Sequence, residues 1–209
     1  MSIEERILRE ILDIEWDMFH HVPNQGGPAA CQQNRKMFEL MRASQIRSWS
    51  PEAAASYLED LRAARAQGRN LMTEKYARMM EHTVPSEFRE IESHLPPVEA
   101  TAEALVERLV LRLVHWQEEL AAKYPRVAAR GRPLRSSEDS PCVTSFETYT
   151  RGELATYSTR TLALLEEHYL QMAARGENPA EGVLENMVKG LGYQSIEQAE
   201  EAQKMCAKP

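Results

Sequence analysis

The sequence is poor in cysteine and in basic charge. Its three cysteines, Cys31, Cys142 and Cys206, are an odd number at wide spacings, which favours free thiols in a reducing compartment over a disulfide framework. The 25 basic residues are outnumbered by 32 acidic ones, so the formal net charge is -7. Such a surface repels the phosphates of nucleic acids and of anionic membranes. We therefore expect neither nucleic acid nor a membrane as the main partner.

Long hydrophobic runs are also missing. The most apolar stretch, residues 104–114, is interrupted by Glu107, Arg108 and Arg112, and a membrane-spanning helix needs roughly 20 consecutive apolar residues. The first residues carry mixed charge and lack the apolar segment of a secretion signal. The sequence therefore predicts a cytoplasmic protein without a signal peptide or a membrane span.

What the sequence does contain is helical periodicity. Apolar residues recur at spacings of three and four, as at Ile7, Ile11 and Ile14, and this pattern is typical of amphipathic helices. No alternating strand pattern and no internal repeat is present. A chain of 209 residues with 43% hydrophobic content can form one sizeable core. We predict a single all-α domain over residues 1–209, a bundle of about seven to nine helices.

Prolines, glycines and capping residues divide this pattern into segments. The expected helices cover residues 3–21, 29–49, 51–68, 70–82, 87–94, 98–124, 146–175 and 179–189, and a last helix begins near residue 195. Residues 126–142 have no helical period and exceed the usual connection length of about 12 residues. We expect a binding loop there, before the helix that starts near Phe146, or else a hinge between two helical subdomains.

Residues 144–158 combine several hydroxyl groups with acidic, basic and phenolic side chains. The acidic, basic and phenolic members are Glu147, Tyr149, Arg151, Glu153 and Tyr157. If a helix starts near residue 145, pairs of these residues lie four positions apart, and side chains from one helix can reach a common ligand. We interpret this segment as the wall of a pocket.

Further polar residues lie on two other expected helices. They are Arg42, Gln45, Arg69, Asn70 and Arg78. The guanidinium group suits two-pronged recognition of a carboxylate or phosphate, so inward-facing arginines would indicate an anionic small molecule. The alternative is a set of surface ion pairs, such as Glu74 with Arg78, each contributing about 0.3–0.5 kcal/mol.

Cys31 follows a glycine-rich loop and is expected in the first turn of the helix over residues 29–49. A helix N-terminus favours the thiolate form of cysteine, so Cys31 is a candidate nucleophile, with His20 and His21 just upstream. The alternative is a small buried thiol beneath the start of the helix.

A metal site is a further alternative, formed by Glu15, Asp17, His20 and His21. Asp17 lies three and four residues before the two histidines, which can place ligands on one helix face. The Glu-x-x-His motifs of helical di-iron sites are absent, and paired surface charges or a core-edge histidine explain most such clusters. We expect no metal or other cofactor; if a metal is bound, these four residues are its expected ligands.

Polar segments along nearly the whole chain carry a family resemblance. They are residues 15–19, 26–32, 41–45 with Trp49, 68–71, 74–80, 144–158, and 185–187 before Gly192-Tyr193. Together they resemble the bacterial domain-of-unknown-function family 4125. The resemblance brings no assigned catalytic residue. Some members look fused to a nucleotidyltransferase-like domain that this chain lacks, which implies a nucleotidyltransferase-like protein as a candidate partner.

We therefore expect an enzyme, a lyase or hydrolase, that acts by acid–base chemistry on a small anionic metabolite such as an amino acid derivative. Glu147 and Glu153 would be the acid–base groups, with pKa values moved toward neutral pH by burial. Tyr149 and Tyr157 would donate hydrogen bonds, and Cys31 would be the nucleophile if one is used. The substrate-binding residues would be Arg42, Gln45, Arg69, Asn70, Arg78 and Arg151.

Two alternatives stay open at this point. One is a non-catalytic helical partner of a nucleotidyltransferase-like protein, and the other is a metal-dependent helical enzyme. The enzyme hypothesis depends on one geometric condition, namely that the acidic, guanidinium and phenolic groups of several helices converge in an enclosed cavity.

Overall fold

The computed structural model describes residues 2–24 and 27–206, with the side chains of residues 205 and 206 left out. Gln25 and Gly26 of the glycine-rich loop, and the thiol of Cys206, therefore lie outside the described part. Eleven α-helices are present in that part, and its only β-type contact is an isolated bridge between Ser140 and Val143. The all-α prediction is confirmed.

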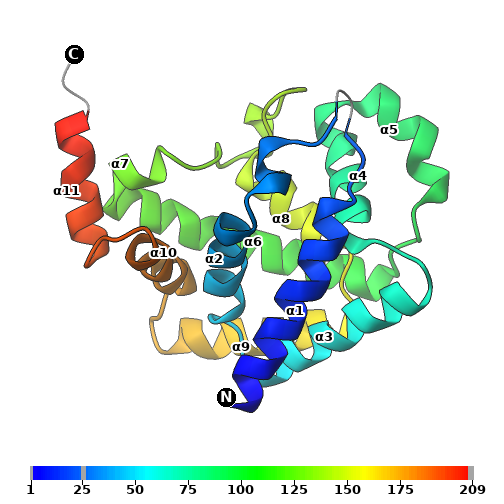
Figure 1. The fold of residues 1–209 in the computed structure, drawn as a ribbon, viewed down its shortest axis with the longest axis horizontal. Coiled ribbons are helices and arrows are strands. Elements are labelled where there is room, and N and C mark those ends of the chain that lie inside the picture. Colours follow the sequence, from blue (N-terminus) through cyan, green and yellow to red (C-terminus); the bar gives the residue numbers. More distant parts are fainter. Residues whose placement is uncertain (1, 25–26, 207–209) are drawn as a thin grey trace.

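The helices follow one another along the chain as Figure 1 shows. Their bounds are α1 (Ile3–His20), α2 (Arg35–Ile46), α3 (Pro51–Ala66), α4 (Leu71–Thr83), α5 (Pro85–Ile91), α6 (Ala100–Lys123), α7 (Pro125–Ala128), α8 (Phe146–Leu154), α9 (Thr159–Ala174), α10 (Pro179–Gly190) and α11 (Ile196–Cys206). Three short 3-10 helices lie between them: η1 (Ala30–Gln33), η2 (Glu92–His94) and η3 (Ser136–Glu138).

Side-chain caps account for most helix starts. Ser50, Asn70, Ser145 and Ser158 each accept a hydrogen bond from the backbone N–H three residues later, which satisfies one of the unpaired N–H groups at a helix N-terminus. After α3 the chain turns at Gly68, whose φ of +69° is in the left-handed region that favours glycine. The segment boundaries read from the sequence therefore have local causes.

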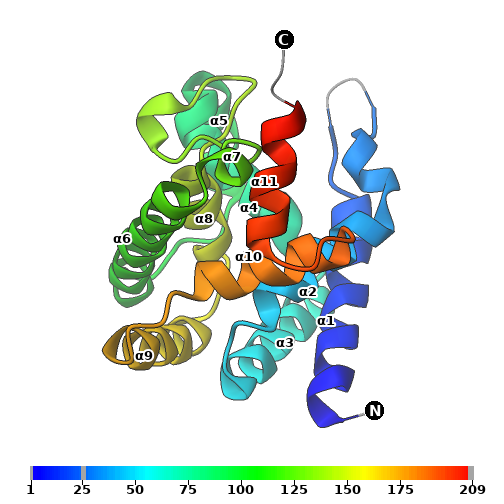
Figure 2. The same cartoon turned by 90° about the vertical axis from the view of Figure 1, so that its left-hand side faces the viewer.

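The core forms around α6, as its apolar pattern predicts. Leu105, Leu109, Val110 and Val114 of this helix are buried in a cluster that also includes side chains of α1, α3 and α9. A smaller cluster joins the end of α6 to α10 and α11, and Figure 2 shows α11 standing above α10. In the described part of the chain, no helix is long and apolar enough to cross a membrane.

The segment expected as one helix over residues 29–49 is divided into η1 and α2. Buried Gln32 is the cause, because its side-chain amide donates hydrogen bonds to the carbonyls of Phe19 and Val22 at 2.8 and 2.9 Å. Its oxygen accepts from the Asn24 amide and from the Ala29 N–H at 2.7 and 2.8 Å. These four bonds hold the loop against the end of α1, and α2 begins only after this anchor.

The segment expected as one helix over residues 146–175 is also divided, into α8 and α9. Ser158 caps α9, and its own N–H donates to Asp60 of α3 at 3.0 Å. The chain therefore turns where a distant helix supplies an acceptor. Together with short α7, this division explains why the structure has more helices than the sequence pattern indicates.

Candidate functional site

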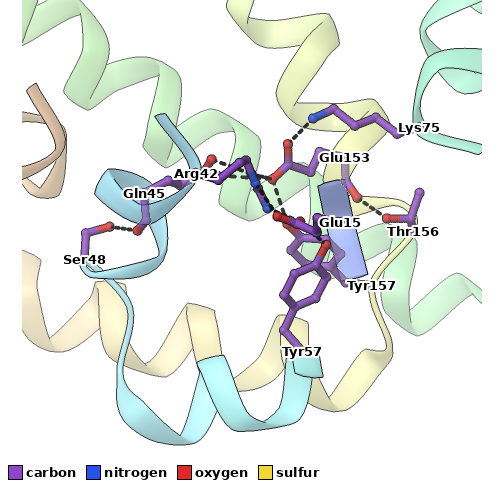
Figure 3. A network of polar contacts seen from close by, with 9 residues as sticks. All are labelled: Glu15, Arg42, Gln45, Ser48, Tyr57, Lys75, Glu153, Thr156 and Tyr157. Carbon is purple, nitrogen blue, oxygen red and sulfur yellow. Dashed lines mark hydrogen bonds and ion pairs between the residues drawn. The ribbon is translucent and has the colours of Figure 1, made fainter. Parts of the chain in front are cut away.

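Four charged side chains from four helices meet inside the bundle (Figure 3). Glu15 of α1, Arg42 of α2, Lys75 of α4 and Glu153 of α8 are each no more than 5% exposed. Two carboxylates and two cations give this buried network a formal charge of zero. Such a set of charges is tolerated inside a protein only when each is paired and hydrogen-bonded.

Arg42 lies at the centre of the network. Its Nε and Nη2 donate to the two carboxylate oxygens of Glu15 at 2.8 and 2.6 Å, and its Nη1 donates to Oε1 of Glu153 at 2.7 Å. The Gln45 amide bridges the same groups, accepting from Arg42 at 2.6 Å and donating to Glu153 at 3.2 Å. Lys75 pairs with the other oxygen of Glu153. The guanidinium thus binds two carboxylates that are far apart in the sequence.

Two buried phenols complete the coordination of the carboxylates. The Tyr57 hydroxyl donates to Glu15 at 2.6 Å, and the Tyr157 hydroxyl donates to Glu153 at 2.7 Å. The two tyrosine rings lie 4.5 Å apart, and the Trp49 ring packs edge-on against both. The aromatic rings therefore cover one side of the network.

The network keeps Glu153 ionised. Burial alone would raise the pKa of its carboxyl group, but Arg42 and Lys75 outweigh this effect and lower the pKa of Glu153 below its ordinary value. Burial and the neighbouring Glu153 raise the pKa of the Tyr157 phenol. The expectation that burial moves Glu153 toward neutral pH is therefore wrong, because two cations surround the carboxylate.

Lys75 links the network to a cluster nearer the surface. Its Nζ lies 3.7 Å from the centre of the Tyr149 ring and 5.9 Å from that of Tyr76, and both rings are half-buried. The guanidinium carbon of exposed Arg132 lies 4.5 Å from the centre of the same Tyr149 ring. Burial, followed by the nearby Tyr149 phenol, raises the pKa of Tyr76 to about 12, and exposed Cys31 contributes in the same direction.

We call Lys75, Tyr76, Arg132 and Tyr149 the Tyr149 cluster. The loop before α8 places Arg132 in it. Phe146 N–H donates to the Pro133 carbonyl at 2.7 Å, and Asp139 accepts from the Ser145 N–H at 2.6 Å. The predicted long loop is therefore folded over the start of α8 by hydrogen bonds of its own.

Glu147 and Arg151 belong to α8 but lie outside the network. Arg151 donates from Nε and Nη2 to Glu107 of α6 at 2.8 and 3.0 Å, and it lies 3.4 Å from Glu147. Glu147 accepts from the Ser136 N–H at 3.0 Å. Although burial acts in the opposite direction, the hydrogen bonds from Ser136 and the charge of Arg151 lower the pKa of Glu147. Neither residue is among the hydrogen-bond or ion-pair partners of Glu153.

Three other predicted binding residues have structural partners of their own. Arg69 forms two bonds to Glu74 at 2.8 and 2.7 Å, so Glu74 pairs with Arg69 instead of Arg78. Asn70 caps α4 and donates to the Met18 carbonyl at 2.8 Å. Arg78 donates to the Pro96 carbonyl at 2.6 Å. None of the three reaches the network.

The sequence pattern predicts Cys31 in the first turn of an α-helix, and this prediction is wrong. It is exposed on the four-residue η1 and lies four positions before α2 begins at Arg35. The argument that a helix N-terminus favours its thiolate therefore does not apply. What remains is an exposed free thiol.

The four expected metal ligands do not converge. Glu15 faces the core, whereas Asp17 and His21 form an exposed pair at 3.5 Å on the opposite side of α1. The His20 ring contacts the Gln32 carbonyl at 3.1 Å. Among the residues that the structure describes, no group of three His, Cys, Asp or Glu side chains is placed to hold a metal ion. These residues therefore do not fit the proposed metal site.

The charged groups of the network are in direct contact instead of lining an open cavity. Two hollows of about 210 and 150 Å³ occur at other places. The larger lies where the start of α1 meets the end of α2, and the smaller lies between α4, α5, α6 and α8. No network residue lines either hollow. Acidic, guanidinium and phenolic groups of several helices do converge, but neither of these two hollows is the enclosed cavity that the enzyme hypothesis also requires.

Several residues of the site are missing from the predictions made on sequence. Lys75, Tyr57, Arg132 and Gln32 are the most important. A signal for Lys75 exists, because it lies four residues after Leu71 and four before Met79, both of which are buried on the same face of α4. Charged residues at apolar positions of a helix indicate buried charge. Arg132 lies in a loop and Gln32 in the short η1, and neither has such a signal.

Comparison with known proteins identifies the family but no activity. No curated protein and no solved structure matches the chain. One family model, described as "Protein of unknown function (DUF4125)", matches residues 5–201. This span includes all residues of the buried network and of the Tyr149 cluster. The match covers nearly the whole chain, and the protein therefore belongs to the DUF4125 family.

Proposed function

We propose that the protein is a cytoplasmic enzyme that binds a small anionic metabolite, such as an amino acid derivative, at the Tyr149 cluster. It would act on this metabolite by acid–base chemistry as a lyase or hydrolase, without a cofactor. The observation that carries the proposal is the position of Lys75, which is paired with buried Glu153 and lies 3.7 Å from the centre of half-buried Tyr149. The buried charge network, which is energetically costly to form, is therefore in contact with side chains near the surface.

The energetic cost of the network supports a functional role. Replacing a buried ion pair by apolar residues of similar size is often neutral or stabilises a protein by about 1–4 kcal/mol. A bundle of this size could pack Leu or Met at these positions. The network instead holds the ammonium of Lys75 at one place, and pre-organised charge of this kind is what a binding site requires.

Charge and hydrogen-bonding capacity support an anionic ligand. Within the described part of the chain, Arg132 makes its one hydrogen bond to the Thr144 carbonyl at 3.1 Å and pairs with no carboxylate. A free guanidinium can bind a carboxylate or phosphate with two parallel hydrogen bonds. The Tyr76 phenol, with its pKa raised to about 12, is protonated at neutral pH and can donate a further hydrogen bond.

The proposed roles differ from those expected on sequence. Glu153 stays ionised and would act as a positioning residue for Lys75, while Glu147 and Arg151 would stabilise the start of α8. Proton transfer would use the hydroxyl group of Tyr149, the Tyr76 phenol would donate a hydrogen bond, and the Cys31 thiol would be the nucleophile if one is used. Arg42 and Gln45 would contribute through Glu153 instead of touching substrate.

The test uses the full chain with pooled carboxylate and phosphate metabolites. Consumption of substrate would be followed by NMR, and binding by the shift in Tm. We expect at least one metabolite to be bound and converted, Arg132→Ala to weaken its binding roughly tenfold or more, and Tyr149→Phe to reduce turnover. Arg135→Ala is the matched control, because Arg135 lies in the same loop but pairs with Glu118.

Two results would end the enzyme proposal. One is that no metabolite in the pool is bound or converted. The other is that Arg132→Ala and Tyr149→Phe bind and convert the metabolite as well as the Arg135→Ala control does. Both variants alter half-buried or exposed side chains, so circular dichroism and Tm should stay close to those of the unmodified protein.

A second candidate function is docking to a nucleotidyltransferase-like protein. Met37 and Met41 lie one turn apart on α2 and are 37% and 49% exposed, and Leu191, which follows α10, is 52% exposed. α10 packs against α2, so these apolar side chains occur on neighbouring elements, as at protein interfaces. Met41→Glu should abolish co-elution with such a protein, whereas Leu111→Glu on α6 should not. Equal co-elution of both variants would reject this interface.

A further inference from the structure

The hollow of about 150 Å³ lies on a different face of α8 from the buried network. Its α8 wall contains Thr148, Arg151 and Gly152, whereas Tyr149 and Glu153 face Lys75. The other walls come from α4, α5 and α6. We call this hollow the α5 groove, because Phe88 of α5 forms part of its lining. It is separate from the Tyr149 cluster.

The α4 wall of the α5 groove contains a guanidinium without a counter-ion. Arg78 donates from Nη2 to the Pro96 carbonyl at 2.6 Å, and its buried Nε has no hydrogen-bond partner. Arg78 forms no ion pair within the described residues: Glu74 is paired with Arg69, and Glu81 acts on Arg78 only from beyond ion-pair distance. A buried N–H of a charged group is costly to leave without an acceptor. An acceptor in the groove would bind the remaining N–H groups of this guanidinium and not the enclosed Nε.

The α6 wall contains a carboxylate without a counter-ion. Glu103 lines the groove, is exposed, and pairs with no cation among the residues that the structure describes. Its neighbour Glu107, one turn further along α6, is by contrast neutralised by Arg151 at 2.8 and 3.0 Å. Glu81 of α4 also lines the groove, is exposed and forms no ion pair among the described residues. The groove therefore presents one unpaired guanidinium and two unpaired carboxylates, of which Glu103 comes from a different helix than Arg78.

We infer that the α5 groove binds a small zwitterionic amino carboxylate, with its carboxylate at Arg78 and its ammonium group at Glu103. The volume supports a ligand of few atoms, because about 150 Å³ corresponds to roughly five waters of about 30 Å³ each. This is below the roughly 300–1,000 Å³ of sites for drug-sized ligands. Phe88, Val98 and Val106 supply the apolar part of the lining.

The test is calorimetric titration of the full chain with glycine, β-alanine and 4-aminobutyrate, and with acetate and ethylamine as singly charged probes. We expect at least one amino carboxylate to bind at least tenfold more tightly than acetate or ethylamine. Glu103→Gln and Arg78→Met should each weaken that binding tenfold or more. Glu99→Gln and Arg89→Met are matched controls, because these residues do not line the groove.

Three outcomes would overturn the inference. The first is that none of the amino carboxylates binds the unmodified chain, and the second is that acetate binds as tightly as they do. The third is that Glu103→Gln binds like the Glu99→Gln control; this exposed position decides the matter even if Arg78→Met does not fold. Arg132→Ala should bind amino carboxylates unchanged, and a loss there would assign the binding to the Tyr149 cluster instead.

Discussion

The Lys75 ammonium is held by two residues of α8 that lie one helical turn apart. It pairs with the Glu153 carboxylate and lies 3.7 Å from the centre of the Tyr149 ring. A cation over an aromatic ring contributes about 2 kcal/mol or more when both are removed from water. Lys75 therefore joins α4 to α8 and connects the interior charges to the Tyr149 cluster.

Removing both charges of the Lys75–Glu153 pair should destabilise the protein less than the sum of the two single changes. Lys75→Met leaves two carboxylates around one guanidinium, and Glu153→Gln leaves two cations with one carboxylate. Each single change should lower the free energy of unfolding by about 3–5 kcal/mol. The double variant should lose less than the sum, because its remaining charges, Arg42 and Glu15, are balanced.

Urea unfolding of the four proteins measures this coupling. Arg62→Met is the control, because it breaks an exposed pair with Glu10 and should cost far less than Lys75→Met. Strict additivity in the double variant would show that the two charges do not interact.

Acid should destabilise the protein through Glu153. The pKa of Glu153 is lower in the folded chain than in the unfolded chain, because Arg42 and Lys75 overcome the effect of burial. A group of this kind contributes stability above its unfolded pKa and loses it as the pH falls through the folded pKa. The free energy of unfolding should therefore decrease as the pH is lowered from about 5.

Urea unfolding at a series of pH values between about 3 and 7 tests this dependence. In Glu153→Gln the acidic part of the profile should be shallower, since one proton-binding group with a lowered pKa is missing. Profiles of equal slope in the two proteins would mean that Glu153 does not carry the acid sensitivity.

Gly152 allows the close approach of α4 and α8. A Cβ at this position would lie 2.9 Å from Cγ of Met79 and 3.0 Å from the Lys75 carbonyl oxygen. Gly152→Ala should lower the free energy of unfolding by about 1–3 kcal/mol, despite the better helix propensity of alanine. Gly182→Ala on α10 meets nothing within 4 Å and should be neutral or stabilise by up to about 1 kcal/mol. Equal effects of both changes on thermal unfolding would contradict the close-packing argument.

Replacing Gln32 should lower the free energy of unfolding more than replacing its neighbour Gln33. Gln32→Glu replaces the donor that binds the Phe19 and Val22 carbonyls with a second acceptor. It should cost about 1–3 kcal/mol and increase hydrogen exchange at residues 29–34. The same change at exposed Gln33 is the control. Unchanged exchange in Gln32→Glu would show that the loop is held by other contacts.

Much of the fold follows from local features of the sequence. The stripe through Ile7, Ile11 and Ile14 predicts α1, and Ser50 followed by Pro51 predicts the start of α3. The divisions at Gln32 and at Ser158 do not follow in this way, because their hydrogen-bond partners include residues on other elements. Local propensity therefore predicts the all-α class but not every helix boundary.

The candidate site shows the same limit. Glu153, Arg42, Gln45 and Tyr157 are all candidates from their residue type, and the fold brings them together. Arg69, Glu147 and Arg151 have the same chemistry, yet they pair elsewhere. Residue type and helical spacing do not distinguish the two groups, since residues of both groups occur at similar spacings on amphipathic helices.

The sequence by itself determined that this chain forms helices, where most of them begin, and which family it belongs to. Only the tertiary structure decided which charges are buried. Arg42 and Glu153 are separated by 111 positions, and whether such residues pair depends on how α2 and α8 pack. Helical periodicity specifies which residues share a face, but the partner of that face is chosen by the packing of the whole bundle.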